Sequence, residues 1–325
     1  MGLGRWQSSM TPSQTLRNAA VPSAATERSG RSAEMTAAVI GLGYVGLPLA
    51  AAFHDSGFTV VGVDTDPEKI RLLSNGRQYL RHLGPEMPQQ LSQSERFRAT
   101  NDFQCLSEAD AIIVCVPTPL GPHREPDLSY VLQTAEEIGS TVRPGQLIVL
   151  ESTTYPGTTR DEFAPIILEG ARSRGIELER EDPGRTDFST STIPKLVGGL
   201  DPVSGRLAAE LYRHAVANIV EVESAEIAES AKLLENIFRS VNIALVNELK
   251  VILDRMSIDV WEVIRAASTK PFGFMPFYPG PGLGGHCIPI DPFYLSWKAQ
   301  EIGSPTRFIQ LAGEINTAMP HYVVE

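Results

Sequence analysis

The sequence is poor in the features that mark several common classes of protein. Its 325 residues hold only three cysteines, Cys105, Cys115 and Cys287, and none of them forms a CxxC pair. This argues against a disulfide framework or a structural zinc site and predicts a reducing, cytoplasmic location. No apolar stretch approaches the ~20 residues that a membrane-spanning helix needs. The N-terminal region also lacks the apolar core of a secretory signal.

Basic residues are scarce as well. Lys and Arg number 28 against 39 Asp and Glu, which gives a net charge of −11, and no dense basic run occurs. We therefore expect neither nucleic acid nor an anionic membrane surface as a partner. Hydrophobic residues nevertheless make up 42% of the chain, so it can bury a core. The length favours two domains of ~150 residues each.

Residues 1–35 differ in composition from the rest of the chain. Ser, Thr, Ala and Pro dominate, and apolar periodicity is absent. This predicts a disordered tail, or a mis-assigned start with Met35 as the true first residue. A transit peptide is the alternative, because Arg- and Ser-rich, acid-poor stretches are typical of such peptides.

Order begins with a strand–turn–helix–strand pattern. Residues 37–40 form a short apolar run, and residues 41–46 read Gly-Leu-Gly-Tyr-Val-Gly. Residues 47–53 predict a helix, residues 58–63 predict a second buried strand, and Asp64 follows at once. The GxGxxG sequence in this setting indicates a dinucleotide-binding fold, whereas a glycine turn of an unrelated α/β domain is the alternative.

Each residue type in this motif has a chemical reason. Gly41 permits the tight turn, Gly43 lets backbone N–H groups approach a pyrophosphate, and Gly46 lets the helix pack close to the strand. Asp64 lies 18 residues after Gly46, where a carboxylate can accept a hydrogen bond from a ribose 2′-hydroxyl. A 2′-phosphate would be repelled there, which favours NAD over NADP.

Polar residues follow two further predicted strands. The apolar run 111–116 is followed by Thr118, and the run 146–150 is followed by Glu151 and Thr153. Because parallel strands bind ligands at their carboxyl ends, we expect these side chains to face one crevice. Solvated loop residues are the alternative.

The same pattern sets the fold class and the first domain. Residues 195–199 and 218–220 predict its last strands, and Cys115 is expected to be a core side chain. We therefore predict an α/β protein with an N-terminal, Rossmann-like, doubly wound parallel sheet over residues 36–222.

A long helix follows, over residues 224–255, and opens the second predicted domain, residues 223–325. No Gly or Pro interrupts it, and its apolar residues recur every three or four positions: Ile227, Ala231, Leu234, Phe238, Val241, Leu245, Leu249 and Ile252. A helix of this length, ~48 Å at ~1.5 Å per residue, is expected to connect the two domains and to build a dimer interface within a small α-helical domain.

Three polar residues share another face of this helix, Lys232, Asn236 and Arg239. On a buried helix such donors require an anionic or carbonyl-like partner. The alternative is a solvated stripe, or ion pairing with Glu229 or Glu235.

A glycine- and proline-rich loop over residues 271–285 leads to His286 and Cys287. Its composition excludes a regular helix or strand. Cys287 precedes an apparent helix start, where the helix dipole favours the thiolate, and Asp291 could orient or deprotonate a water. A buried, inert Cys287 is the alternative, and we expect no catalytic role for His286.

These motifs together resemble the UDP-glucose/GDP-mannose dehydrogenase family of nucleotide-sugar 6-dehydrogenases. The matching stretches are residues 39–48, 58–66, 115–119, 151–158, 232–239, 242–249 and 280–295. Residues 151–159 and 271–295 look most like the branch that acts on UDP-N-acetylglucosamine or UDP-N-acetylgalactosamine, because Ile290 stands where the glucose branch usually has Lys.

The resemblance implies oxidation of a sugar C6 alcohol to a carboxylate with two NAD, for cell-surface polysaccharide biosynthesis. Cys287 would hold the aldehyde as a thiohemiacetal and then a thioester. Lys232 and Asn236 would stabilise the oxyanion, Thr153 and Asp291 would position water, and Glu179 would be the general base.

The resemblance also assigns contacts to the cofactor and the substrate. For NAD these are Gly41, Gly43, Tyr44, Val45, Gly46, Asp64, Lys69, Thr118, Glu151 and Thr153. For the UDP-sugar they are Lys232, Asn236, Arg239, Tyr278 and Gly284. A homodimer through helix 224–255 is implied as well, and UDP-glucose or UDP-N-acetylmannosamine are the alternative substrates.

The chain departs from the family at two places. Several residues of a family strand and a Ser-Pro-Glu motif are missing just before Glu179. The family's third, UDP-binding α/β domain is also missing, so we expect a truncated member. An inactive, NAD-binding oligomerisation remnant therefore stays open as an alternative, as does a simple two-electron alcohol dehydrogenase that is indifferent to Cys287.

Overall fold

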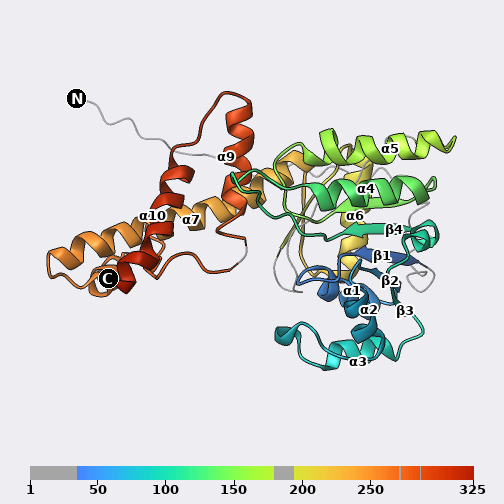
Figure 1. Cartoon of the computed structure of the whole chain (residues 1–325), viewed down its shortest axis with the longest axis horizontal. Coiled ribbons are helices and arrows are strands. Elements are labelled where there is room, and N and C mark those ends of the chain that lie inside the picture. The colour runs from blue at the N-terminus through green and yellow to red at the C-terminus, as the bar shows by residue number, and fades with distance from the viewer. Residues whose placement is uncertain (1–34, 179–193, 271, 286) are drawn as a thin grey trace, which may run out of the picture.

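The computed structural model describes residues 35–178, 194–270, 272–285 and 287–325 (Figure 1). Glu179, the predicted general base, and His286 lie outside these ranges. The predicted tail lies outside them as well, apart from Met35.

A parallel sheet forms the centre of the N-terminal half, in the order β3-β2-β1-β4-β5. Its strands are β1 (Thr36–Ile40), β2 (Thr59–Val63), β3 (Phe97–Thr100), β4 (Ala111–Val114) and β5 (Leu147–Leu150). The chain order reverses between β1 and β4, which confirms the predicted doubly wound arrangement. Such a reversal opens a crevice at the carboxyl ends of the strands.

Strand β3 is missing from the sequence-based prediction. Only Phe97 of its four residues is buried, and Arg98 is exposed. A short edge strand of this kind has no continuous apolar run, so hydrophobic patterning alone does not reveal it.

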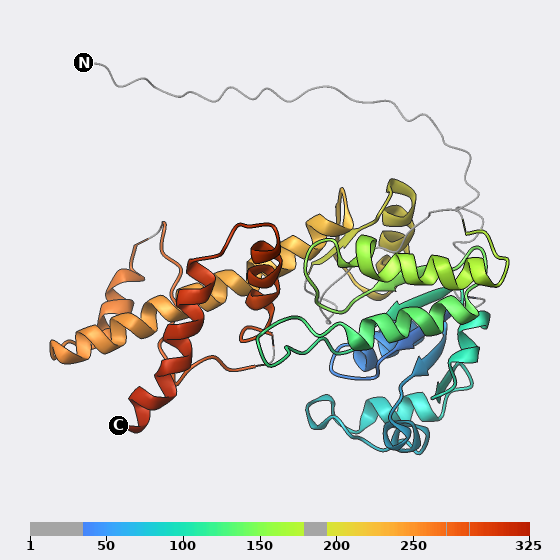
Figure 2. The same cartoon turned by 45° about the horizontal axis from the view of Figure 1, so that its top comes forward.

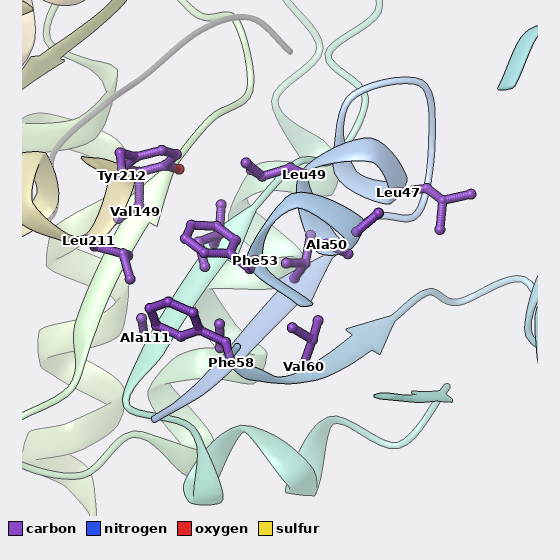
Figure 3. Packing of buried hydrophobic residues seen from close by; sticks show 14 of the residues in the cluster. Leu47, Leu49, Ala50, Phe53, Phe58, Val60, Ala111, Val149, Leu211 and Tyr212 are labelled. Atoms are coloured by element: carbon purple, nitrogen blue, oxygen red, sulfur yellow. The ribbon is translucent and has the colours of Figure 1, made fainter. Parts of the chain in front are cut away.

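Helices cover both faces of the sheet (Figure 1). One face packs against α1 (Gly46–Asp55), α2 (Pro67–Ser74), α3 (Glu86–Ser92) and α6 (Pro202–Ala215), and the other against α4 (Ser129–Thr141) and α5 (Ala164–Ser173). On the first face the Phe53 ring lies 5.4 Å from that of Phe58 and 5.7 Å from that of Tyr212, centroid to centroid (Figure 3). Because successive strand side chains point to opposite faces, Val39 and Ile40 belong to different clusters.

Two more strands, β6 (Lys195–Gly198) and β7 (Ile219–Val222), pair in parallel as a separate two-stranded sheet. Their positions agree with the predicted last strands. Shorter turns are η2 (Arg81–Leu83), η3 (Phe103–Glu108) and the π-helical η4 (Thr158–Phe163).

The long predicted helix is present as α7 (Ala225–Arg255), and the Ser224 side chain caps its first turn by accepting from the Ile227 amide. It runs out of the α/β half, and α8 (Val260–Ala267), α9 (Asp291–Glu301) and α10 (Phe308–Val324) pack against it (Figures 1 and 2). Among the described residues, no helix is both long enough and apolar enough to cross a bilayer.

Candidate active site

The glycine turn between β1 and α1 shows a different constraint at each glycine. Gly41 has φ +91°, and a Cβ there would lie 2.5 Å from the Cys115 carbonyl oxygen, while a Cβ on Gly46 would collide with the Gly41 carbonyl. A Cβ on Gly43 would meet nothing within 4 Å. Packing therefore requires glycine at positions 41 and 46. Gly43 instead faces open space, which leaves room for a pyrophosphate to approach the backbone. Val45 precedes the helix and Tyr44 is exposed.

Asp64 follows β2 and organises this turn. Its carboxylate accepts from the amides of Leu42 (2.8 Å) and Asp66 (3.0 Å) and from Lys69 Nζ (2.9 Å). Burial, together with the charges of Asp64 and Asp66, raises the pKa of Tyr79, whose hydroxyl donates to the Leu42 carbonyl. A contact of Asp64 with the ribose, or of Lys69 with NAD, stays a prediction. The Asp64 carboxylate stands at the strand end where the motif requires it.

The loops that follow β4 and β5 are joined to each other. The Thr118 hydroxyl donates to the Thr153 carbonyl (2.7 Å), and the Ser152 hydroxyl donates to the Val116 carbonyl (2.7 Å). The two strand ends therefore form one continuous edge, which is the arrangement expected for the crevice.

The surroundings of the Glu151 carboxylate are not those that the sequence predicts. The sequence predicts its carboxylate at the crevice, whereas the structure buries it, and it accepts from Lys195 Nζ (2.5 Å) and from the Tyr212 hydroxyl (2.6 Å). The reason is that β6 brings a buried lysine to the end of β5. A contact with NAD stays a prediction for Glu151, and the ion pair gives it a structural role.

The polar residues of α7 were predicted either to meet a ligand inside the protein or to be solvated or ion-paired on its surface, and the structure gives different answers for different residues. Lys232 and Asn236 are buried, 4% and 0% exposed, so the solvated-stripe alternative is wrong for these two. Arg239 is partly exposed and pairs with Glu235 at 3.0 Å, as the ion-pair alternative proposes, and its guanidinium also donates to the Asn236 side chain.

The cysteine segment meets α7 through Asp291. Asn236 Nδ2 donates to Asp291 Oδ2 at 2.6 Å, and Asp291 is 3% exposed. Half-buried Cys287 lies one turn earlier, because its carbonyl accepts from the amides of Ile290 (3.0 Å) and Asp291 (2.8 Å). The helix proper therefore begins four residues after Cys287, slightly later than the sequence predicts.

Helix α9 is docked at the carboxyl edge of the sheet. The buried Tyr294 hydroxyl donates to the Thr118 carbonyl, just beyond β4. Tyr294 also packs with Leu128 and Tyr155, which belong to the loops after β4 and β5. In Figures 1 and 2 the loop between β4 and α4 reaches α9, and Arg124 of this loop lies 4.6 Å from the Phe293 ring centroid. The segment that carries Cys287 is thus brought to the predicted cofactor edge.

Two predicted substrate residues have more open surroundings. Tyr278 is 56% exposed and stacks on Trp261 at 6.0 Å between ring centroids. A Cβ on Gly284 would meet nothing within 4 Å.

Sequence reasoning did not identify the buried residues that connect the strand ends, loops and helices of the site. They are the buried residues Lys195, Asn247 and Tyr294, together with Glu229, which the sequence offered only as an ion-pair partner of the polar stripe. Their signal in the sequence is weak. Glu229 shares a helix face with Lys232, and Lys195 is a charged residue at the start of an apolar strand.

The fold and these side chains define a class of protein, the dinucleotide-binding dehydrogenases. Comparison with known proteins gives the family. The profile described as "UDP-glucose/GDP-mannose dehydrogenase family, NAD binding domain" matches residues 35–216, and the profile of that family's central domain matches residues 226–318. The chain belongs to the UDP-glucose/GDP-mannose dehydrogenase family. It is an oxidoreductase that acts on CH–OH groups, with NAD as its cofactor.

Individual relatives agree. The chain is 38% identical over 299 residues to a UDP-N-acetyl-D-glucosamine 6-dehydrogenase of Pseudomonas aeruginosa, covering 90% of this chain and 69% of the relative. A UDP-D-ManNAc dehydrogenase structure from Pyrococcus horikoshii superposes with TM-score 0.78 at 31% identity, covering 89% of this chain and 70% of that one. A UDP-glucose dehydrogenase structure from Pyrobaculum islandicum gives TM-score 0.81 at 26% identity, covering 90% and 71%.

Proposed function

We propose that the protein oxidises the C6 alcohol of a UDP-N-acetylhexosamine to the uronic acid in two NAD-dependent steps. The observation that carries this proposal is the docking of the Cys287 segment at the carboxyl edge of β4, through Tyr294 and Thr118. A thiol beside that edge can retain a half-oxidised sugar. The proposed role in cell-surface polysaccharide biosynthesis rests on the resemblance of the sequence to the nucleotide-sugar 6-dehydrogenases.

NAD, when bound, supplies the hydride acceptor, and Gly41, Gly43, Gly46 and Asp64 are the residues that would hold it. The Cys287 thiolate adds to the C6 aldehyde and forms a thiohemiacetal, whose oxidation leaves a thioester that water hydrolyses. A covalent adduct of this kind prevents loss of the reactive aldehyde between the steps.

Buried polar groups of α7 and α9 serve the same centre. Lys232 and Asn236 would stabilise the oxyanion that forms at C6, because donors in a buried site need no reorganisation. Asp291, held by Asn236 at 2.6 Å, would orient the hydrolytic water together with Thr153. Glu179, the proposed general base, lies outside the described residues.

The identity of the sugar is a finer proposal. We favour UDP-N-acetylglucosamine or UDP-N-acetylgalactosamine, and Arg239, Tyr278 and Gly284 are the proposed substrate contacts. UDP-N-acetylmannosamine is equally compatible with the relatives, and UDP-glucose stays the less favoured alternative, because Ile290 replaces the Lys expected for glucose.

A homodimer through α7 is part of the proposal. Much of the predicted apolar stripe lies on the surface, 38% to 65% exposed: Ile227, Leu234, Phe238, Leu245, Leu249 and Ile252. Exposed apolar side chains that recur along one helix face favour an interaction site. Light scattering on the wild type and on Leu245→Glu tests this, with the dimer expected only for the wild type. Monomeric wild type at micromolar concentration contradicts it.

The test of the function is the NADH yield from a limiting amount of each UDP-sugar. We expect two NADH per UDP-N-acetylhexosamine and no second NADH with Cys287→Ser. One NADH per sugar, unaffected by Cys287→Ser, favours the two-electron alcohol dehydrogenase. NAD binding without turnover of any UDP-sugar favours the inactive remnant.

A further inference from the structure

The segment that follows β5 runs toward α7, where it donates hydrogen bonds to a single buried carboxylate, that of Glu229. Glu229 is 0% exposed. Its Oε2 accepts from the Gly157 amide at 2.6 Å, and its Oε1 accepts from the Thr159 amide at 3.2 Å and from the Thr159 hydroxyl at 2.7 Å. A carboxylate that accepts several hydrogen bonds inside a protein fixes the positions of all its donors.

The backbone at this contact has an uncommon conformation. Gly157 has φ +95°, in the left-handed region, and the π-helical η4 begins at the next residue. Single π-helical turns are rare and are frequently found at functional sites. Thr158 and Thr159 are fully buried, so this conformation is maintained by its buried contacts.

Glu229 stands between two sets of proposed catalytic groups. On α7 it lies one turn before Lys232 and two turns before Asn236, and all three share a helix face. Its partner Gly157 ends the loop that starts at the β5 end and carries Thr153, and its partner Thr159 lies in the first turn of η4, directly after that loop. The carboxylate therefore connects the cofactor edge with the oxyanion-stabilising helix.

We propose that Glu229 is a positioning residue, which sets the distance between the Thr153 loop and the Lys232–Asn236 face of α7. The proposal rests on the proposed function of this site. A carboxylate suits the role because it only accepts hydrogen bonds. In Glu229→Gln one oxygen becomes an NH2 group, which faces N–H donors and pushes the loop away.

The test compares Glu229→Gln with Glu226→Gln. Glu226 lies on the same helix and pairs with Arg160 of η4, but this pair is partly exposed and such pairs contribute little. For Glu229→Gln we expect a folded protein whose Kd for NAD stays within about threefold and whose kcat falls about 10- to 100-fold, since small misplacements of reacting groups have effects of this size. The kinetic isotope effect on kcat with a C6-deuterated sugar rises, because hydride transfer becomes rate-limiting. Glu226→Gln behaves as the wild type.

A second variant, Thr159→Val, removes the hydroxyl contact alone and is expected to give a smaller fall in kcat with the same rise in isotope effect. If both variants lower the melting temperature but keep kcat per folded molecule and the isotope effect, Glu229 is only structural and the proposal is overturned.

A wild type that oxidises no UDP-sugar contradicts the proposed function separately. Amide hydrogen exchange with NAD bound then decides the positioning role. Faster exchange in Glu229→Gln that extends from Gly157 back to Thr153 supports it, and a change confined to Gly157 and Thr159 overturns it.

Discussion

The two halves of this molecule are held together by different kinds of contact. In the α/β half, two apolar clusters lie on the faces of a parallel sheet, and glycines set the tight turn between β1 and α1. In the helical half, α7 buries Glu229, Lys232, Asn236, Ser240 and Asn247, and the described apolar clusters around it are small. A core of the first kind follows from local sequence patterns, whereas contacts of the second kind require partners far apart in the chain.

The largest expected loss of stability comes from the buried Lys195–Glu151 pair. This pair is an exception to the contrast, because it is a long-range polar contact within the α/β half. Lys195→Met leaves the carboxylate buried without its cation, which typically costs about 3–5 kcal/mol. Urea unfolding measures this loss. The double variant Lys195→Met/Glu151→Leu should recover most of it, and a loss below about 1 kcal/mol, the range of surface pairs, contradicts the burial.

A matched pair of glycine variants separates folding from cofactor binding in the α/β half. Gly46→Ala forces the turn apart, because its Cβ collides with the Gly41 carbonyl, and we expect a loss of stability of about 3 kcal/mol. Gly43→Ala meets open space, so its melting temperature should not change while its Kd for NAD rises at least about tenfold, equivalent to about 1.4 kcal/mol. Equal stability losses for the two variants contradict this division.

In the helical half the corresponding test removes a buried side-chain amide, that of Asn247. Asn247 donates to Asn316 Oδ1 at 2.9 Å and accepts from the Gly280 amide at 2.9 Å, which ties the glycine-rich loop to α7 and α10. Asn247→Ala leaves the buried Asn316 side chain and the half-buried Gly280 amide without this partner, so we expect a loss of about 1–3 kcal/mol. Asn242→Ala on the same helix is the control, because the half-buried Asn242 side chain donates to the Phe238 carbonyl of its own helix. It should change the free energy of unfolding by less than about 0.5 kcal/mol.

The smallest effect concerns the cysteines of the two halves. Burial raises the pKa of the Cys105 thiol, so the folded state holds this proton more tightly than the unfolded chain does. Its contribution to stability is present below the ordinary thiol pKa and is lost as the pH rises above it. Iodoacetamide at pH 8 should therefore modify half-buried Cys287 before Cys105. Mass spectrometry of tryptic peptides checks the order, and equal rates contradict it.

The same contrast explains what the sequence could predict. Continuous apolar runs revealed β1, β2, β4 and β5, and the glycine spacing revealed the turn, because neighbouring residues encode both. The short edge strand β3 escaped for want of such a run. Helical spacing singled out Lys232 and Asn236, the expected helix start singled out Cys287 and Asp291, and the family resemblance gave all four their roles. The contacts made by Glu229, Asn247, Tyr294 and Lys195 could not be predicted, since each acts through a partner at least 33 residues away.

The central claim is that Cys287 faces the nicotinamide at the carboxyl edge of β4 and β5. A crystal structure of the protein with NAD and a UDP-N-acetylhexosamine tests it directly. We predict the sugar C6 within about 4 Å of both Cys287 Sγ and the nicotinamide ring, as reacting atoms require. A sulfur turned away from the ring, with C6 held by other groups, contradicts the account.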